Sequence, residues 1–456
     1  MAIPQRPRAM VPFRRTSFGL KEMVQPELES DYASRLVASA RANGGWIVLP
    51  SLRVRLPAVF GFCHGVERAI SLAYETRRRF PRARLFITDE IVHNPAVNRH
   101  LIDMGYRFLH GRYATADRIE DIGKGDVVVL PAFGAESEEV TRLRASGAFI
   151  VDTTCGEVMS VWRTVHAYAR EGYTAVIHGT PGHQETRATA SRVTHADPFS
   201  RWGAARPGRY LIVRDLDDAE RVCRYIEGES NRESFLTRFA GVASPGFDPD
   251  RDLERVGIAN QTTMLAAETL AIQARFLDAF VRRHGDAGAR ERLRLVETIC
   301  TATQERQDAI RAVIDARPSL LLVVGGYNSA NTRHLATLGC ERGIATFHVS
   351  GAESLVDRGT IRHWDDGRGE EIAQGPWWPA GEPATIAVAA GASTPDRIVG
   401  ALVVRLIELA GERVRALDEC AFGLPPTRAS PRARDPALPD PVVSPQIQTA
   451  EKEQRG

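Results

Sequence analysis

Lysine is almost absent from this chain of 456 residues, although lysine and arginine together number 59. The only lysines are Lys21, Lys124 and Lys452, so arginine carries nearly all of the positive charge. No lysine stands in the GKS or GKT pattern of a phosphate-binding loop, and none has the setting of a Schiff-base lysine. The sequence therefore argues against a P-loop nucleotide enzyme and against covalent catalysis by lysine.

An excess of charge of one sign is missing as well. The formal net charge is only +2, which leaves no electrostatic footprint for nucleic acid or a membrane surface. No apolar run approaches the length of a membrane-spanning helix, and the N-terminus lacks the apolar core of a signal peptide. The six cysteines are widely spaced and form no CxxC pair, unlike the disulfide framework of a small secreted domain. We expect a soluble, cytoplasmic protein that binds neither nucleic acid nor membrane.

Short aliphatic runs alternate with helical patterns along most of the chain. Such runs are typical of buried parallel strands, and the alternation predicts an α/β fold with mostly parallel sheets. The predicted strands are 84–88, 126–130, 148–151, 174–177, 210–213, 255–259, 320–324 and 385–389. Helices are predicted at 27–43, 158–170 and 215–226, an extended run at 56–60, and long connections at 228–252 and 367–383. Residues 1–16 are predicted to be disordered.

Polar and small residues follow nearly every predicted strand. Ser, Thr, Asn, His, Glu, Cys and Gly occupy these positions instead of generic loop residues. Because chemistry in parallel sheets sits at the carboxyl ends of the strands, this concentration predicts a functional site there.

Cys63, Cys155 and Cys300 share one setting, since each lies at the start of a predicted helix. Unpaired N–H groups and the helix dipole favour a thiolate at that position. Three thiolates suit zinc or an iron–sulfur cluster and leave one metal position open. The alternative is three unrelated core cysteines, and the pattern alone leaves both interpretations open. Cys223, Cys340 and Cys420 are interpreted as structural.

Other candidates supply protons or bind an anion. Glu185 follows His183 in a glycine-flanked loop and could relay protons, whereas His93 and His183 could donate to an anionic substrate. Neutral donors at strand ends suit a phosphate near helix N-termini, although each alone is more often a helix cap. These donors are Thr262, Thr263, Ser329, Asn331 and Ser393. The histidines given no functional role are His64, His100, His178, His334 and His348.

A series of ordered motifs adds to this picture. They are Gly-Phe-Cys-x-Gly-Val-Glu-Arg-Ala at 61–69, Glu-Ile-Val-His-Asn-Pro at 90–95, Leu-Pro-Ala-Phe-Gly-Ala at 130–135, Val-Asp-Thr-Thr-Cys at 151–155, Gly-Ile-Ala-Asn-Gln-Thr-Thr-Met-Leu at 257–265, Ala-Thr-Gln-Glu-Arg-Gln-Asp-Ala at 302–309, Val-Val-Gly-Gly-x-Asn-Ser at 323–329 and Gly-Ala-Ser-Thr-Pro-Asp at 391–396. From about Phe18 to about Leu409 the chain resembles the 4-hydroxy-3-methylbut-2-enyl diphosphate reductase family, most strongly its plant and cyanobacterial branch.

The resemblance implies three small α/β units around a pseudo-threefold axis, with a central iron–sulfur site. In this family Cys63, Cys155 and Cys300 would hold one 4Fe-4S cluster per chain. The implied units are 56–154, 155–299 and 300–412. They follow an N-terminal arm at 1–55 that is partly disordered, and they precede a Pro-rich tail at 413–456 that is largely disordered.

The resemblance also implies an activity. The family reduces (E)-4-hydroxy-3-methylbut-2-enyl diphosphate to isopentenyl and dimethylallyl diphosphate, the last step of the methylerythritol phosphate route to isoprenoids. Ferredoxin or flavodoxin would supply the electrons. Glu185 matches the proton-relay carboxylate, with Thr262 as its helper. The implied substrate-binding residues are His93, His183, Thr263, Ser329, Asn331 and Ser393.

Several positions depart from the family pattern. Gly156 to Ser160 replaces a run that usually holds Pro and a Thr/Ser-Lys pair, Ala330 replaces a serine, and Phe133 is the residue usual in the plant-like branch. These changes leave room for a divergent cluster-binding paralogue with another substrate or a sensing role. A third hypothesis is a three-cysteine zinc hydrolase.

Overall fold

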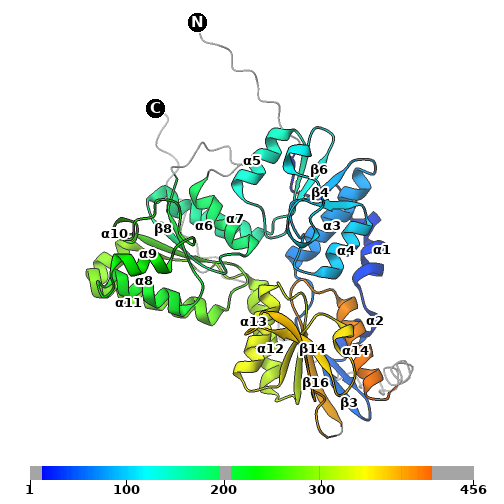
Figure 1. Ribbon diagram of the computed structural model, residues 1–456. Helices are drawn as coiled ribbons and strands as arrows, with labels where there is room; N and C mark the ends of the chain where they lie inside the picture. Colours follow the sequence, from blue (N-terminus) through cyan, green and yellow to red (C-terminus); the bar gives the residue numbers. More distant parts are fainter. Residues whose placement is uncertain (1–12, 196–206, 297, 382, 413–456) are drawn as a thin grey trace, which may run out of the picture. The chain divides into compact units, whose positions relative to one another are not determined.

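The computed structural model describes residues 13–195, 207–296, 298–381 and 383–412, and Figure 1 shows its helices and strands. These residues form three β-sheets, two entirely parallel and one mixed. The predicted α/β class with mostly parallel sheets is therefore confirmed. The arrangement around a pseudo-threefold axis stays a prediction. The predicted disorder of residues 1–12 and of the tail at 413–456 lies outside the described residues.

The first sheet has the strand order β1-β7-β6-β4-β5. Its strands are β1 (Phe13–Arg14), β4 (Leu85–Ile87), β5 (Tyr106–Phe108), β6 (Val127–Leu130) and β7 (Phe149–Asp152). Its helices are α3 (His64–Arg79), α4 (Pro95–Asp103) and α5 (Ser137–Ser146), with the short η1 (Gly111–Tyr113) and η2 (Ile119–Asp121). Alternate residues along β6 enter two separate cores, one containing α3 and the other α5, so the sheet is covered on both faces.

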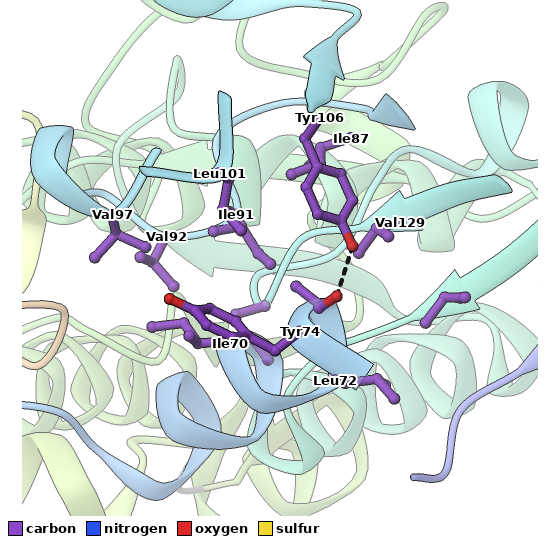
Figure 2. Packing of buried hydrophobic residues seen from close by; sticks show 14 of the residues in the cluster. Ile70, Leu72, Tyr74, Ile87, Ile91, Val92, Val97, Leu101, Tyr106 and Val129 are labelled. Atoms are coloured by element: carbon purple, nitrogen blue, oxygen red, sulfur yellow. Dashed lines mark hydrogen bonds between the residues drawn. The ribbon is translucent and has the colours of Figure 1, made fainter. Parts of the chain in front are cut away.

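Helix α3 packs on this sheet through an apolar stripe. Ile70 and Tyr74 are one helical turn apart and lie against Ile87, Leu101 and their neighbours (Figure 2). The Tyr106 hydroxyl donates to the carbonyl of Ala73 at 2.6 Å, which is the dashed line in Figure 2. The helix that begins just after Cys63 is thus fixed to the first sheet.

The second sheet has the order β11-β10-β8-β9. Its strands are β8 (Thr174–His178), β9 (Tyr210–Val213), β10 (Val256–Asn260) and β11 (Leu293–Leu295). Its helices are α6 (Gly156–Glu171), α7 (Gln184–Thr194), α8 (Leu216–Ile226), α9 (Arg232–Arg238), α10 (Pro249–Asp252) and α11 (Ala266–Arg292). The connection predicted at 228–252 contains α9 and α10, because Phe235 and Phe239 are buried in the core of this sheet.

The third sheet has the order β15-β14-β13-β12-β16-β3-β2. Its strands are β2 (Trp46–Val48), β3 (Leu52–Arg55), β12 (Leu320–Val324), β13 (Thr346–Val349), β14 (Ile361–Asp365), β15 (Glu370–Gln374) and β16 (Ala384–Ala390). The helices of this part are α12 (Thr301–Asp315), α13 (Ala330–Glu341), α14 (Asp396–Leu409) and η3 (Ala352–Ser354). Strand β15 lies within the connection predicted at 367–383.

The N-terminal residues differ from their prediction. Strand β3 pairs in parallel with β16, so residues 46–55 complete the third sheet, and the blue β3 lies beside the orange β16 in Figure 1. Residues 13–14 are extended and pair with β7. The helix predicted at 27–43 is two helices, α1 (Lys21–Tyr32) and α2 (Arg35–Ala42), because Ser34 caps the second one. The extended run predicted at 56–60 contains no strand, because β3 spans Leu52–Arg55 and ends before it. The predicted domain boundaries stay predictions. The third sheet combines β2 and β3, from the predicted N-terminal arm at 1–55, with strands of the predicted unit at 300–412.

Each of the three candidate metal-binding cysteines lies where the chain passes from one sheet to the next. Cys63 lies between β3 of the third sheet and α3, Cys155 between β7 and α6, and Cys300 between β11 and α12. The topology therefore places the three residues in equivalent connections. None of the helices in the described part of the chain is long and apolar enough to span a membrane. The cytoplasmic location stays a prediction.

Candidate active site

Cys63, Cys155 and Cys300, together called the cysteine triad, occupy the N-cap positions of α3, α6 and α12, and the side chain of Cys300 also accepts a hydrogen bond from Thr303 N–H. A Cβ placed on Gly65 would lie 2.6 Å from the sulfur of Cys155 and 3.9 Å from that of Cys63. The missing side chain of Gly65 therefore allows these two cysteines to approach each other. Cys63 also acts electrostatically on the thiol of Cys300, so the third cysteine belongs to the same group.

Burial dominates the ionisation of the triad. It raises the pKa of Cys155, and it raises the pKa of Cys300 to about 11. Backbone N–H groups at the helix starts act in the opposite direction, as the sequence predicts, and Thr303 N–H donates to the Cys300 sulfur at 3.3 Å. Those hydrogen bonds alone do not offset burial. A bound metal centre would supply the remaining stabilisation of the thiolates.

The spacing of the triad distinguishes a single ion from a larger group. A tetrahedral zinc with Zn–S bonds of about 2.3 Å brings its sulfur ligands to about 3.8 Å from one another. Among the described residues, Asp215, Asp217 and Asp218 are the only group of three His, Cys, Asp or Glu side chains whose ligand atoms all lie within 4.8 Å of one another. The three sulfurs of the triad are therefore not all within that distance. The triad is wider, and its all-thiolate donor set fits an iron–sulfur cluster better than one zinc ion.

Glu185 lies in the first turn of α7 and is only 2% exposed. Its Oε1 accepts a hydrogen bond from Thr262 N–H at 2.6 Å. Burial outweighs that bond and raises the pKa of Glu185. The carboxyl therefore keeps its proton to a higher pH than an exposed glutamic acid, which suits a proton donor.

The two predicted anion-binding histidines are neighbours. The ring centroids of His93 and His183 lie 4.8 Å apart, and both residues are buried. Nδ1 of His93 lies 3.3 Å from a carboxylate oxygen of Glu90, and Nδ1 of His183 accepts from Glu185 N–H at 3.2 Å. Nε2 of each ring is buried without a hydrogen-bond partner in the described part of the chain. Such atoms are costly to bury without a partner, so the pair is suited to binding an anionic ligand.

The predicted polar donors extend the same region. Asn331 accepts from Ala392 N–H at 2.9 Å through Oδ1, which leaves its buried Nδ2 without a partner among the described residues. Ser329 accepts from Thr332, and Thr263 accepts from Gln261, so both hydroxyl hydrogens remain available to a ligand. Ser393 instead donates to the backbone carbonyl of His93 at 3.0 Å.

Backbone hydrogen bonds join the triad to these side chains. The pairs are Cys63 N–H to Ala392 O (3.0 Å), Cys155 N–H to Ala132 O (2.8 Å) and Cys300 N–H to Thr262 O (3.4 Å). Ser393 follows Ala392. Phe133 follows Ala132, and its ring stacks on that of His93 at 4.5 Å and 9°. Thr262 bonds Glu185. The structure thus joins the triad to both histidines, Glu185, Thr262, Asn331 and Ser393 in one network. Thr263 and Ser329 are the chain neighbours of Thr262 and of Asn328, which contacts His93.

Three residues near the network received no role from the sequence. Glu90 and Asn328 contact each other and His93. Arg306 is buried on α12 and donates to the carbonyl of Gly61 at 2.8 Å, which ties that helix to the loop before Cys63. All three residues lie inside the motifs at 90–95, 323–329 and 302–309. Their position in these motifs was the only sequence feature that could have indicated a role.

Comparison with known proteins identifies the family. The sequence model of the LytB protein family matches residues 54–407. The chain belongs to the LytB family. The 4-hydroxy-3-methylbut-2-enyl diphosphate reductase of Gloeobacter violaceus is 46% identical over 401 residues, covering 87% of this chain and 92% of the relative. The protein of the same description from a Synechococcus strain is 44% identical over 398 residues, with 87% and 94% covered. The family predicted from the motifs is therefore confirmed.

The fold of this chain is also seen in a solved structure. The E-1-hydroxy-2-methyl-but-2-enyl-4-diphosphate reductase from Plasmodium falciparum superimposes with a TM-score of 0.55 at 20% identity. The match covers 79% of this chain and 89% of the other. This likeness supports the fold described above.

Proposed function

We propose that the protein reduces (E)-4-hydroxy-3-methylbut-2-enyl diphosphate to isopentenyl and dimethylallyl diphosphate. The LytB family assignment and the reductase relatives that cover 87% of the chain support this function. The site observation that carries it is the network that joins the cysteine triad, the buried Glu185 and the buried side-chain nitrogens that have no hydrogen-bond partner among the described residues. The overall reaction breaks one C–O bond, consumes two electrons and two protons, and releases water.

The proposed cofactor is a 4Fe-4S cluster held by Cys63, Cys155 and Cys300. When bound, it would supply electrons and one iron position that no cysteine occupies. The proposed electron donor is a ferredoxin or a flavodoxin.

The protein's own residues bind and orient the substrate. His93, His183 and Asn331 offer buried nitrogens to the diphosphate, and the hydroxyls of Ser329 and Thr263 add further donors. Because backbone bonds tie these loops to the triad, the allylic end of a bound diphosphate is directed toward the cysteines. The burial of the donors excludes water that would compete with the anion.

Glu185 provides the proton that lets the hydroxyl leave as water. Burial raises the pKa of the carboxyl, so it keeps a proton to higher pH than an exposed glutamic acid and can donate it as the C–O bond breaks. The N–H of Thr262 then stabilises the carboxylate that remains, through the bond of 2.6 Å to Oε1. Thr262 therefore assists the proton donor in both of its states.

The decisive experiment combines metal analysis with turnover on one anaerobically purified sample. We expect about four iron and four sulfide per chain, and oxidation of reduced methyl viologen that depends on substrate and yields both products. A Cys300→Ser variant is the matched control and should lose both signals. Iron without turnover would reject the reductase function in favour of a cluster-binding or sensing paralogue. Zinc without sulfide would overturn the cluster.

A further inference from the structure

Arg306 places a buried positive charge beside the cysteine triad. It lies on α12, six positions after Cys300, and is 4% exposed. Its Nε and Nη2 donate to the carbonyl of Gly61 at 3.3 and 2.8 Å, and its Nη1 donates to the carbonyl of Ala302 at 2.8 Å. These carbonyls stand two positions before Cys63 and two positions after Cys300. The backbone next to two of the cysteines therefore holds the guanidinium in place.

Arg68 has a similar position on α3. It lies five positions after Cys63 and is half-buried. Its Nη1 donates to the carbonyls of Thr153 and Thr154 at 3.0 and 3.2 Å. These two residues come directly before Cys155, in the loop after β7. Each of the two arginines thus joins the helix that follows one cysteine of the triad to the loop that precedes another.

Neither arginine has a carboxylate partner in the part of the chain that the structure describes. The hydrogen bonds of Arg68 and Arg306 all go to backbone carbonyls. A guanidinium stays charged in a protein, and a buried charge needs a compensating one. Burial lowers the pKa of Arg306, and the charges of Cys63 and Cys300 are the first that oppose this effect. Thiolates of the triad are therefore the counter-charge that this buried cation can have.

A structural tie between loops is the alternative role for these two residues. Arg68 and Arg306 would then only hold neighbouring connections together. A neutral side-chain amide also donates to carbonyls, without the cost of burying a charge. The two roles differ in one measurable quantity, which is the reduction potential of a metal centre held by the triad.

We propose that Arg68 and Arg306 are the counter-charges of the proposed cluster and that they raise its reduction potential. Each one-electron reduction makes the cluster more negative by one unit, while the proposed ferredoxin or flavodoxin is oxidised by one electron. A fixed cation nearby stabilises the reduced form more than the oxidised form. The arginines exchange neither proton nor electron and act only as positioning residues. The inference rests on the proposed function for the identity of the metal centre.

The test is a redox titration of the cluster-loaded protein, purified without oxygen and followed by electron paramagnetic resonance. Arg306→Gln keeps an N–H donor and removes the charge. At a fixed potential we expect the ratio of reduced to oxidised cluster to fall about tenfold, the size expected for a unit charge about 10 Å away at an effective dielectric constant of about 20. For a one-electron couple this is a shift of about 59 mV to lower potential. Iron content should stay at the wild-type value.

Two further variants separate the charge from the hydrogen bonds and from the net charge of the protein. Arg306→Lys keeps the charge but loses the paired N–H groups that bond Gly61, so its potential should lie closer to the wild-type value than that of Arg306→Gln. The matched control is Arg311→Gln on the same helix. It removes an arginine that pairs with the exposed Asp308, and the potential should be unchanged.

Arg68→Gln tests the second cation. Because Arg68 is only half-buried, we expect a smaller shift in the same direction. The variant that carries both Gln substitutions should show the sum of the two shifts, since the two side chains bond different loops. If Arg306→Gln fails to fold, Arg68→Gln carries the test, with Arg68→Lys as the variant that keeps the charge.

A wild-type potential in both Gln variants would overturn the inference. Equal shifts in the Gln and Lys variants would overturn it too, because the lost hydrogen bonds would then be the cause, and so would an equal shift in Arg311→Gln. The proposed function fails separately. The expected shifts without substrate-dependent viologen oxidation would leave the inference standing and reject the reductase. Wild-type protein without iron would reject the cluster and the inference together.

Discussion

Two buried carboxylates near the histidines, Glu90 and Glu185, have pKa values displaced in opposite directions. Glu185 lacks a cationic hydrogen-bond partner among the described residues, so burial dominates and the pKa rises. Glu90 receives hydrogen bonds from His93 and Asn328, and its pKa falls. Separated values of this kind assign one group to proton donation and the other to charge compensation. The contrast arises from hydrogen-bond partners, since both side chains are almost fully buried.

The first prediction concerns Glu185 as the proton donor. Glu185→Gln keeps the acceptor for Thr262 N–H but removes the acidic proton. We expect turnover to fall by about 10²- to 10⁴-fold while iron content stays at the wild-type value. Viologen oxidation and iron analysis check this. Glu138→Gln, on the exposed face of α5, serves as the control. Turnover within a few-fold of wild type would reject the role of Glu185.

The second prediction follows from the raised pKa of Glu185. A carboxyl whose pKa is higher in the folded than in the unfolded chain contributes stability that is fully present below the unfolded pKa. That stability is lost as the pH rises through the folded pKa. Wild type should therefore melt at progressively lower temperature than Glu185→Gln as the pH is raised, starting from near-equal values in acid. Parallel melting curves across the pH range would contradict it.

Local sequence could identify these residues but not their partners. His93, His183 and Glu185 stand in motifs that were recognisable from the chain alone. The bond between Glu90 and Asn328 joins residues 238 positions apart, and no pattern within either motif indicates that pairing. The side-chain nitrogens that lack a partner among the described residues were equally hidden, because burial is a property of the folded chain.

At the scale of elements, the starts of α3 and α6 are packed against each other through the absent side chain of Gly65. Gly65→Ala would place a methyl group 2.6 Å from the Cys155 sulfur. We expect this variant to be purified with less than half of the wild-type iron, and less stable by about 1–3 kcal/mol through overpacking. Iron analysis and thermal melting measure both effects.

The control for that prediction is Gly156→Ala, in the first turn of α6. A Cβ at Gly156 meets no atom within 4 Å, so iron content should be unchanged and stability equal or slightly higher. Equal iron in the two variants would show that the close approach at Gly65 does not control cluster binding. The same variant tests whether Gly156, which departs from the family pattern, affects cluster binding.

The predictability of elements followed their length and hydrophobicity. The long aliphatic runs that became β6, β8, β10 and β12 are buried at every position, and each was predicted within a residue or two. Strands β14 and β15 were missed because they form a partly exposed antiparallel pair, and β15 lies in the connection predicted at 367–383. The break between α1 and α2 depends on the cap at Ser34, which a helical pattern running through residues 27–43 conceals.

For the molecule as a whole, each connection between sheets ends in one cysteine of the triad. A bound cluster should therefore stabilise the first turns of α3, α6 and α12 more than the sheet interiors. We predict faster hydrogen exchange in those turns after anaerobic removal of iron, with α8 as the unaffected control. Hydrogen-exchange mass spectrometry on both forms checks this. A uniform increase across the chain would mean that the cluster acts on global stability only.

The pairing of β3 with β16 sets an order of events during synthesis. The first sheet has all its strands once residue 152 has left the ribosome, whereas the hairpin of β2 and β3 must wait for residues 384–390. The N–H of Cys63 likewise has no acceptor until Ala392 is made. A nascent chain holds its first cysteine unanchored through most of translation. Assembly of the proposed metal centre would therefore have to wait until Ala392 has been made, late in synthesis.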